Sequence, residues 1–210
     1  VFVIEALFST VTNVNFDPDR IEELLRRGQE LLDRLRGAYQ DACRKAGTQP
    51  EQLEGPRCRL AEGRDAMTEQ AAALRISRRI ERLGPDVAGL RELLLYGLKG
   101  TAAYADHARI LGVEDDAAYA FFHEALDFLA GNDGEVVKKL LPMVLRCGEV
   151  NLKVMEMLDR ANTGAYGHPE PTAVRVTPVK GKCIAVSGHD LKDLAQLLEQ
   201  TAGKGVNVYT

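Results

Sequence analysis

The chain has 210 residues, of which 45% are hydrophobic and 28% are charged, and its formal net charge at pH 7 is −4. This length allows one large domain or two small ones with a sizeable core. Acidic and basic side chains are interspersed along the chain, which argues against nucleic acid as a partner. No window approaches the roughly 18 apolar residues of a membrane span, so we expect no membrane segment.

The four cysteines are widely spaced along the chain. They are Cys43, Cys58, Cys147 and Cys183. None lies within four residues of another, which argues against a zinc or iron–sulfur site built from these cysteines alone. The spacing also does not resemble a secretory disulfide framework, so we expect a cytoplasmic protein in a reducing environment.

The first part of the chain is predicted to be helical. Residues 1–8 are typical of the interior of an apolar helix. Asp17 and Pro18 predict the start of a second helix, because Asp is a preferred N-cap and Pro suits the first helical position. Apolar residues then recur at helical spacing until Gly47. An exposed connection over 48–64 and a short polar helix over 66–82 follow.

Three stronger helices are expected next. The first covers residues 86–111 with Asp86 as its cap, and the second covers 115–129 with Asp115 as its cap. The third runs over 132–158, where we expect Pro142 and Gly148 to interrupt the helix and kink it. Together these segments predict a helical bundle domain over residues 1–161.

The character of the sequence changes at residue 162. Residues 162–181 are rich in proline and glycine and predict a linker. A strand over 183–187, a helix over 190–202 and a strand over 206–209 then predict one βαβ unit, with the right-handed crossover that such units adopt. The fold class is therefore mainly α, with a bundle followed by the start of a parallel, Rossmann-like α/β domain over 182–210. One such unit cannot cover both faces of its sheet, so we expect the remaining strands outside this chain.

One histidine lies where a parallel sheet binds its ligands. His189 follows Ser187 and Gly188 at the carboxyl end of the first predicted strand, the edge at which ligands gather in open α/β sheets. Imidazole is the commonest protein metal ligand, and a helix N-terminus favours its neutral form. The alternative is a capping histidine at a strand–helix turn. Asp190 is expected to cap the helix, and Asp193 to complement its dipole.

The remaining candidates have structural interpretations. Three further histidines are expected to be packing, surface or turn residues: His107, His123 and His168. Cys147 is expected to pack between helices, and Cys183 to be a small core residue in a buried strand. Gly97 and Gly100 are expected to allow close helix packing.

Six segments, in order along the chain, resemble the hybrid-cluster protein family, also called prismane proteins or hydroxylamine reductases. They include Leu-Leu-Leu-Tyr-Gly-Leu-Lys-Gly, Ala-Asp-His-Ala and Ser-Gly-His-Asp, and they cover residues 5–17, 90–100, 102–108, 161–172, 187–194 and 203–210. Each segment alone is a weak indication. Six of them in sequence make a chance match improbable.

The resemblance implies a helical domain of packed three-helix bundles followed by two α/β domains. It also implies a cubane-type iron–sulfur cluster on cysteines near the N-terminus and a hybrid iron–sulfur–oxygen cluster where the domains meet. The family's single histidine ligand to the hybrid cluster corresponds to His189. The family's cysteine motif would precede Val1, and a His-Gly-Glu run with a further ligand would follow Thr210. Pro142 also departs from what the family implies.

The function implied by the resemblance is the reduction of hydroxylamine to ammonia, or of a related small N–O compound such as nitric oxide. An electron-donor redox protein would be the partner, and this chain would contribute no catalytic group beyond the metal ligand His189. We expect the chain alone to bind neither cluster and to be inactive. Two alternatives are a helical interaction or assembly module without redox chemistry, and a nucleotide-binding unit. The second is weaker, since no glycine-rich phosphate motif follows the first predicted strand.

Overall fold

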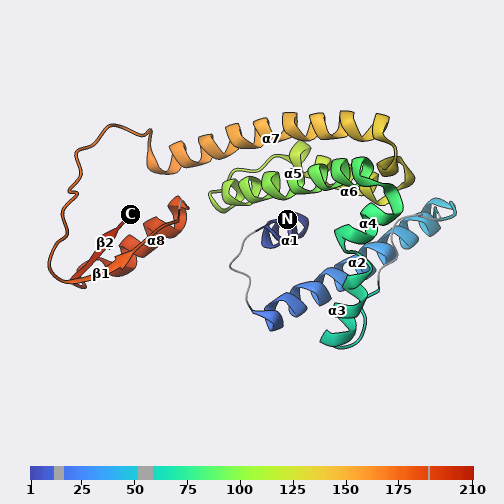
Figure 1. The fold of residues 1–210 in the computed structure, drawn as a ribbon, viewed down its shortest axis with the longest axis horizontal. Helices are drawn as coiled ribbons and strands as arrows, with labels where there is room; N and C mark the ends of the chain where they lie inside the picture. The colour runs from blue at the N-terminus through green and yellow to red at the C-terminus, as the bar shows by residue number, and fades with distance from the viewer. Residues whose placement is uncertain (12–16, 52–58, 189) are drawn as a thin grey trace.

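The computed structural model describes residues 1–11, 17–51, 59–188 and 190–210, and it is mainly helical (Figure 1). The helical part contains α1 (Phe2–Ser9), α2 (Pro18–Ala46), α3 (Arg64–Ala72), α4 (Ile76–Leu83), α5 (Pro85–Ile110), α6 (Asp116–Ala130), the 3₁₀ turn η1 (Asn132–Glu135) and α7 (Val137–Tyr166). The last part contains β1 (Lys182–Ala185), α8 (Leu191–Thr201) and β2 (Val206–Tyr209). The predicted fold class, a helical domain followed by one βαβ unit, is confirmed.

Local capping residues define several helix ends as predicted. The Asp17 side chain accepts hydrogen bonds from the backbone N–H groups of Asp19 and Arg20, with Pro18 at the first position of α2. Gly47 ends that helix in the left-handed conformation, with φ of 68°. The prediction for Asp86 was wrong, because α5 begins at Pro85 and Asp86 lies inside its first turn.

The single polar helix predicted over 66–82 is two helices, α3 and α4. The two helices form ion pairs with different neighbours. Arg64 at the start of α3 pairs with Asp19 of α2. In α4, Arg79 instead pairs with Glu92 of α5 at 2.7 Å.

The predicted interruption of the last long helix was also wrong. Helix α7 runs unbroken from Val137 to Tyr166 through Pro142 and Gly148, so its end overlaps the predicted linker. It lies along α5 over much of its length. Pro142 removes one backbone hydrogen bond from a helix of 30 residues. Residues 132–135 form η1 rather than the first turn of α7.

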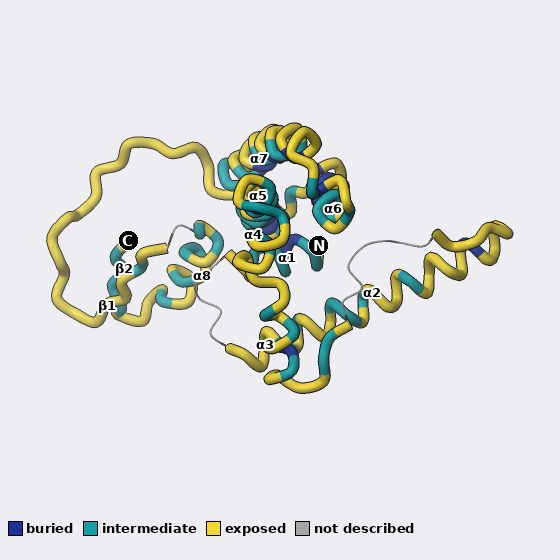
Figure 2. The backbone as a smooth tube through the Cα atoms, turned by 45° about the vertical axis from the view of Figure 1, so that its right-hand side comes forward, coloured by how far each residue is buried: buried dark blue, intermediate teal, exposed yellow. Residues whose placement is uncertain are grey.

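The core lies where α1, α5, α6 and α7 meet, and Figure 2 shows the buried residues gathered there. Fully buried positions on α5 include Leu94, Leu98, Ala102, Ala105 and Ala108. A Cβ atom placed on Gly97 would lie 3.1 Å from the Cys147 sulfur of α7, which confirms that Gly97 allows close packing and that Cys147 packs between helices. Gly100 has no atom within 4 Å of such a Cβ, so the prediction for Gly100 was wrong.

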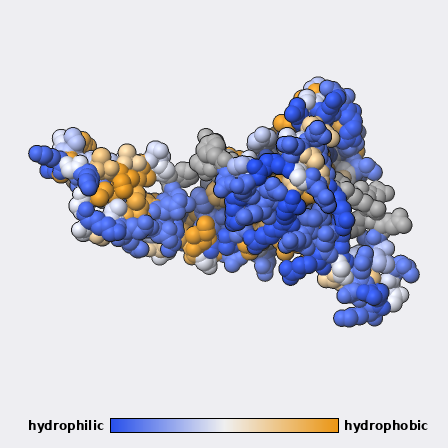
Figure 3. Space-filling model, turned by 90° about the horizontal axis from the view of Figure 1, so that it is seen from below, coloured by the Kyte–Doolittle hydropathy of each residue, from blue (hydrophilic) through white to orange (hydrophobic). Residues whose placement is uncertain are grey.

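The two strands form a parallel pair in which Lys182 lies opposite Val206 and Ala185 lies opposite Tyr209. Strand β1 is shorter than predicted, and its Cys183 is exposed rather than buried. The reason is that, within the described part of the chain, no further strand or helix covers this side of the two-stranded sheet. Figure 3 shows hydrophobic side chains at the surface over this unit. Exposed apolar residues of the unit include Ile184 and Leu198.

No helix within the described ranges combines the length and the apolar character that crossing a bilayer requires.

Candidate functional site at the junction of the bundle and the α/β unit

The predicted ligand His189 lies outside the described residues, but its neighbour Asp190 is described. Asp190 is the N-cap of α8: its Oδ1 accepts hydrogen bonds from the backbone N–H groups of Lys192, at 2.9 Å, and Asp193, at 3.2 Å. The capping role predicted for Asp190 is therefore confirmed. The start of α8 is thus defined by the carboxylate that directly follows His189 in the sequence.

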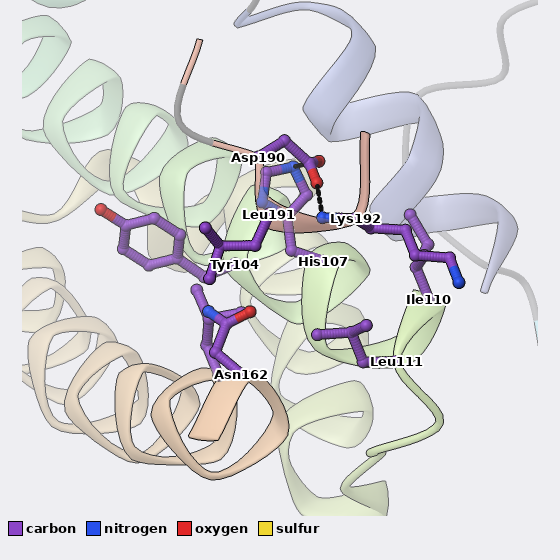
Figure 4. Close-up of a pocket in the computed structure, with 9 residues that line it drawn as sticks. Tyr104, His107, Ile110, Leu111, Asn162, Asp190, Leu191 and Lys192 are labelled. Carbon is purple, nitrogen blue, oxygen red and sulfur yellow. Dashed lines mark hydrogen bonds and ion pairs between the residues drawn. The ribbon is translucent and has the colours of Figure 1, made fainter. Parts of the chain in front are cut away.

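A small pocket of about 60 Å³ lies between the end of α5, the end of α7 and the start of α8 (Figure 4). The lining residues come from these three segments and are both polar and apolar. They are Tyr104, His107, Ile110, Leu111, Leu158, Asn162, Asp190, Leu191 and Lys192. The structure therefore brings the beginning of the βαβ helix against the helical bundle.

His107 of α5 lies between two other elements in this pocket. Its Nε2 is 3.4 Å from Oδ2 of Asp190. On α1, the ring of Phe8 meets the imidazole edge to face, with ring centroids 5.2 Å apart and an interplanar angle of 78°. The sequence interpretation of His107 as a packing residue was correct but missed its contact with Asp190. Two of the family-like segments, Ala-Asp-His-Ala and Ser-Gly-His-Asp, carry these residues and were the available indication.

The part of α5 that carries His107 is fixed by charged neighbours. Arg109 donates to Oδ1 of the buried Asp106, at 2.9 Å, and to Oε1 of Glu5 on α1, at 3.1 Å. The hydrogen bond to Asp106 raises the pKa of Arg109, so the guanidinium stays charged. This network ties α1 to the end of α5.

The described part of the chain does not make a metal site by itself. Among those residues, no group of three or more His, Cys, Asp or Glu side chains is placed to hold a metal ion. The pocket offers His107 and Asp190, which are two potential donors. Burial raises the pKa of the Cys147 thiol, which favours the neutral form over the thiolate that metals bind. The described residues therefore do not fit an iron–sulfur cluster on their own.

The other candidates lie apart from the pocket. His123 is exposed on α6, and His168 is exposed in the segment after α7. Cys43 and Cys147 are buried and free, Cys183 is exposed and free, and Cys58 lies outside the described residues. Neither His123 nor His168 lines the pocket at the junction.

Comparison with known proteins gives a match over the full chain. Residues 1–210 match the sequence model of the Prismane/CO dehydrogenase family. The chain is 53% identical to a hydroxylamine reductase of Rhodospirillum rubrum, 50% identical to one of Burkholderia lata and 49% identical to one of Syntrophobacter fumaroxidans. Each match covers the whole of this chain and 38% of the relative, so the chain spans well under half of the length of these relatives.

Proposed function

Because the chain belongs to the Prismane/CO dehydrogenase family, we propose that it is the helical domain and first βαβ unit of a hydroxylamine-reducing iron–sulfur enzyme. The six sequence segments predicted this membership. The observation that supports the activity is the similarity to relatives named hydroxylamine reductase. They are about 50% identical to this chain over its whole length.

The proposed reaction is the cleavage of the N–O bond of hydroxylamine. Two electrons and two protons convert hydroxylamine into ammonia and water. An electron-donor redox protein would supply the electrons, and nitric oxide is a related small substrate of the same chemical class. The iron–sulfur clusters supply the redox chemistry when they are bound, and the protein supplies ligand geometry and access.

Within this chain, His189 is the residue that we propose as a ligand to iron of the hybrid iron–sulfur–oxygen cluster. Its sequence position supports this role, because it directly precedes the residue that caps α8 at the pocket between the bundle and the α/β unit. We propose that the other ligands and the cubane-type cluster lie in the part of the longer relatives that this chain does not match. The chain's own contribution is one ligand and the framework that surrounds it.

Replacement of His189 in the full-length protein tests this proposal. The His189→Ala variant should lose the paramagnetic signal of the hybrid cluster and keep that of the cubane cluster, because the clusters use separate ligands. Hydroxylamine turnover should fall by at least about 10-fold, the scale of losses when even outer partners of a metal are removed. The matched control is His123→Ala, which removes an exposed imidazole of α6. A normal hybrid-cluster signal and full turnover in His189→Ala would show that His189 is only a turn residue.

A helical assembly module without redox chemistry is the second candidate, and one observation favours it. An apolar crevice of about 570 Å³ lies between α1 and α2, lined in part by Phe2, Ile21, Leu24 and Leu25. Such a groove can accept another helix. Iron analysis of the full-length protein separates the two functions, since a pure assembly module would contain no iron.

A further inference from the structure

We propose that His107 is a positioning residue that holds the start of α8 against the helical bundle through the carboxylate of Asp190. Both partners of this contact, His107 and Asp190, lie in the described part of the chain. Its consequence for the neighbouring His189 rests on the function proposed above.

The covalent connection between the bundle and the α/β unit does little to place α8. Every residue from Gly167 to Gly181 is exposed, and Figure 1 shows this segment looping away from both parts. Val176, near its middle, is 91% exposed. The position of the first turn of α8 therefore depends on non-covalent contacts at the pocket.

The two oxygens of the Asp190 carboxylate have different partners. Oδ1 accepts both capping hydrogen bonds from the first turn of α8, whereas Oδ2 lies 3.4 Å from Nε2 of His107. Capping sets the orientation of the carboxylate plane, so the second oxygen is directed towards α5. One side chain thus joins the start of α8 to the bundle.

His107 itself is held in place from the other side. The ring of Phe8 packs on the imidazole, and the side chain of His107 is only 19% exposed. Arg109, within the next turn of α5, is joined to α1 by its ion pair with Glu5 and is held on its own helix by Asp106. A fixed imidazole that faces a fixed carboxylate can restrain the start of α8, which directly follows His189 in the sequence.

The test is amide hydrogen exchange of the full-length protein, prepared with and without iron, in peptides that cover residues 186–194. His107→Ala removes the imidazole. Asp190→Ser keeps a capping oxygen but removes the second oxygen that faces His107. Each variant should exchange about two- to five-fold faster in these peptides, as expected when one partly exposed polar contact is lost. The matched controls, Asp193→Ser in the same turn and His123→Ala, should exchange as the parent protein does.

The double variant distinguishes a direct contact from two separate structural effects. If His107 acts through Asp190, the variant with both changes should exchange no faster than either single variant. His107→Gln should restore protection, because its amide N–H can reach the same carboxylate oxygen and donate to it. The same variant serves as the test if His107→Ala fails to fold. If the double variant instead showed the product of the two single-variant increases in exchange rate, the inference would be overturned.

Iron content separates this inference from the proposed function. In the iron-loaded protein, His107→Ala should lower hybrid-cluster occupancy about two-fold or more and leave the cubane cluster intact. Unchanged exchange and occupancy in His107→Ala, together with cluster loss in His189→Ala, would overturn the inference and leave the function standing. Faster exchange in His107→Ala with a normal cluster in His189→Ala would support the contact and overturn the ligand assignment.

Discussion

Helices α5 and α7 approach closely at Gly97, so the effect of adding a methyl group there can be calculated. Alanine is favoured over glycine in a helix interior by about 1 kcal/mol, so Gly97→Ala would stabilise α5 if there were room. The new Cβ would instead lie 3.1 Å from the Cys147 sulfur, and overpacking of a core contact costs about 1–3 kcal/mol. We therefore expect Gly97→Ala to be neutral or to lower the free energy of unfolding by up to about 2 kcal/mol.

Gly100 on the same helix is the matched control, because a Cβ there meets no atom within 4 Å. Gly100→Ala should raise the free energy of unfolding by about 0.5–1 kcal/mol, through helix propensity alone. The difference between the two variants in free energy of unfolding isolates the cost of the contact with the Cys147 sulfur and should be about 1–3 kcal/mol. Urea unfolding followed by far-ultraviolet circular dichroism measures it.

A second comparison tests whether the Cys147 sulfur is the cause. In a Cys147→Ala background the sulfur is gone, so Gly97→Ala should there approach the effect of Gly100→Ala. Equal stabilities of Gly97→Ala and Gly100→Ala in the parent chain would refute the reasoning. So would a destabilisation by Gly97→Ala that persists unchanged without the sulfur.

Three further predictions concern a cap, a half-buried cation and the cysteine thiols. Asp115→Ala should lower the free energy of unfolding by about 1 kcal/mol in urea unfolding, whereas Asp115→Asn should change it little, because asparagine also caps α6. Arg91→Ala should cost about 1–3 kcal/mol by the same measurement, because Arg91 donates at 2.6 Å to two backbone carbonyls, one near the end of α6 and one in η1. Iodoacetamide should alkylate the exposed Cys183 first and Cys147 only on unfolding, as mass spectrometry would show. Burial raises the pKa of Cys147 in the folded protein, so the stabilisation from its neutral thiol is fully present below the ordinary thiol pKa and is lost as pH rises through the folded-state pKa. In urea unfolding at increasing pH, Cys147→Ala should not show this loss of stability.

Helix starts and ends were predictable where a local interaction sets them. The Asp17 cap, the glycine at position 47 and the Asp115 cap each act within a few residues of the backbone groups that they satisfy. The division between α3 and α4 was not predictable in this way. The polar sequence of 66–82 is compatible with one helix or two, and the ion pairs of Arg64 with α2 and of Arg79 with α5 join residues too far apart in the sequence to be foreseen.

Whether strand β1 is buried depends on the layers that pack on its sheet. The apolar residues from Cys183 to Val186 predict a buried strand, and such a strand needs layers on both faces. With β2 as its partner in the described structure and no covering layer, β1 is exposed along its length. The apolar pattern therefore predicted the strand correctly and its burial incorrectly.

The candidate site shows the same division between local and long-range causes. Asp190 was predicted as a helix cap from its position alone, and its hydrogen bonds to Lys192 and Asp193 agree. Its approach to His107 could not be derived from either sequence segment, because it depends on how α8 docks on α5. The structural and functional interpretations of Asp190 do not compete. The helix start occupies one carboxylate oxygen and thereby orients the other, so the cap itself allows a distant histidine to restrain the turn beside His189.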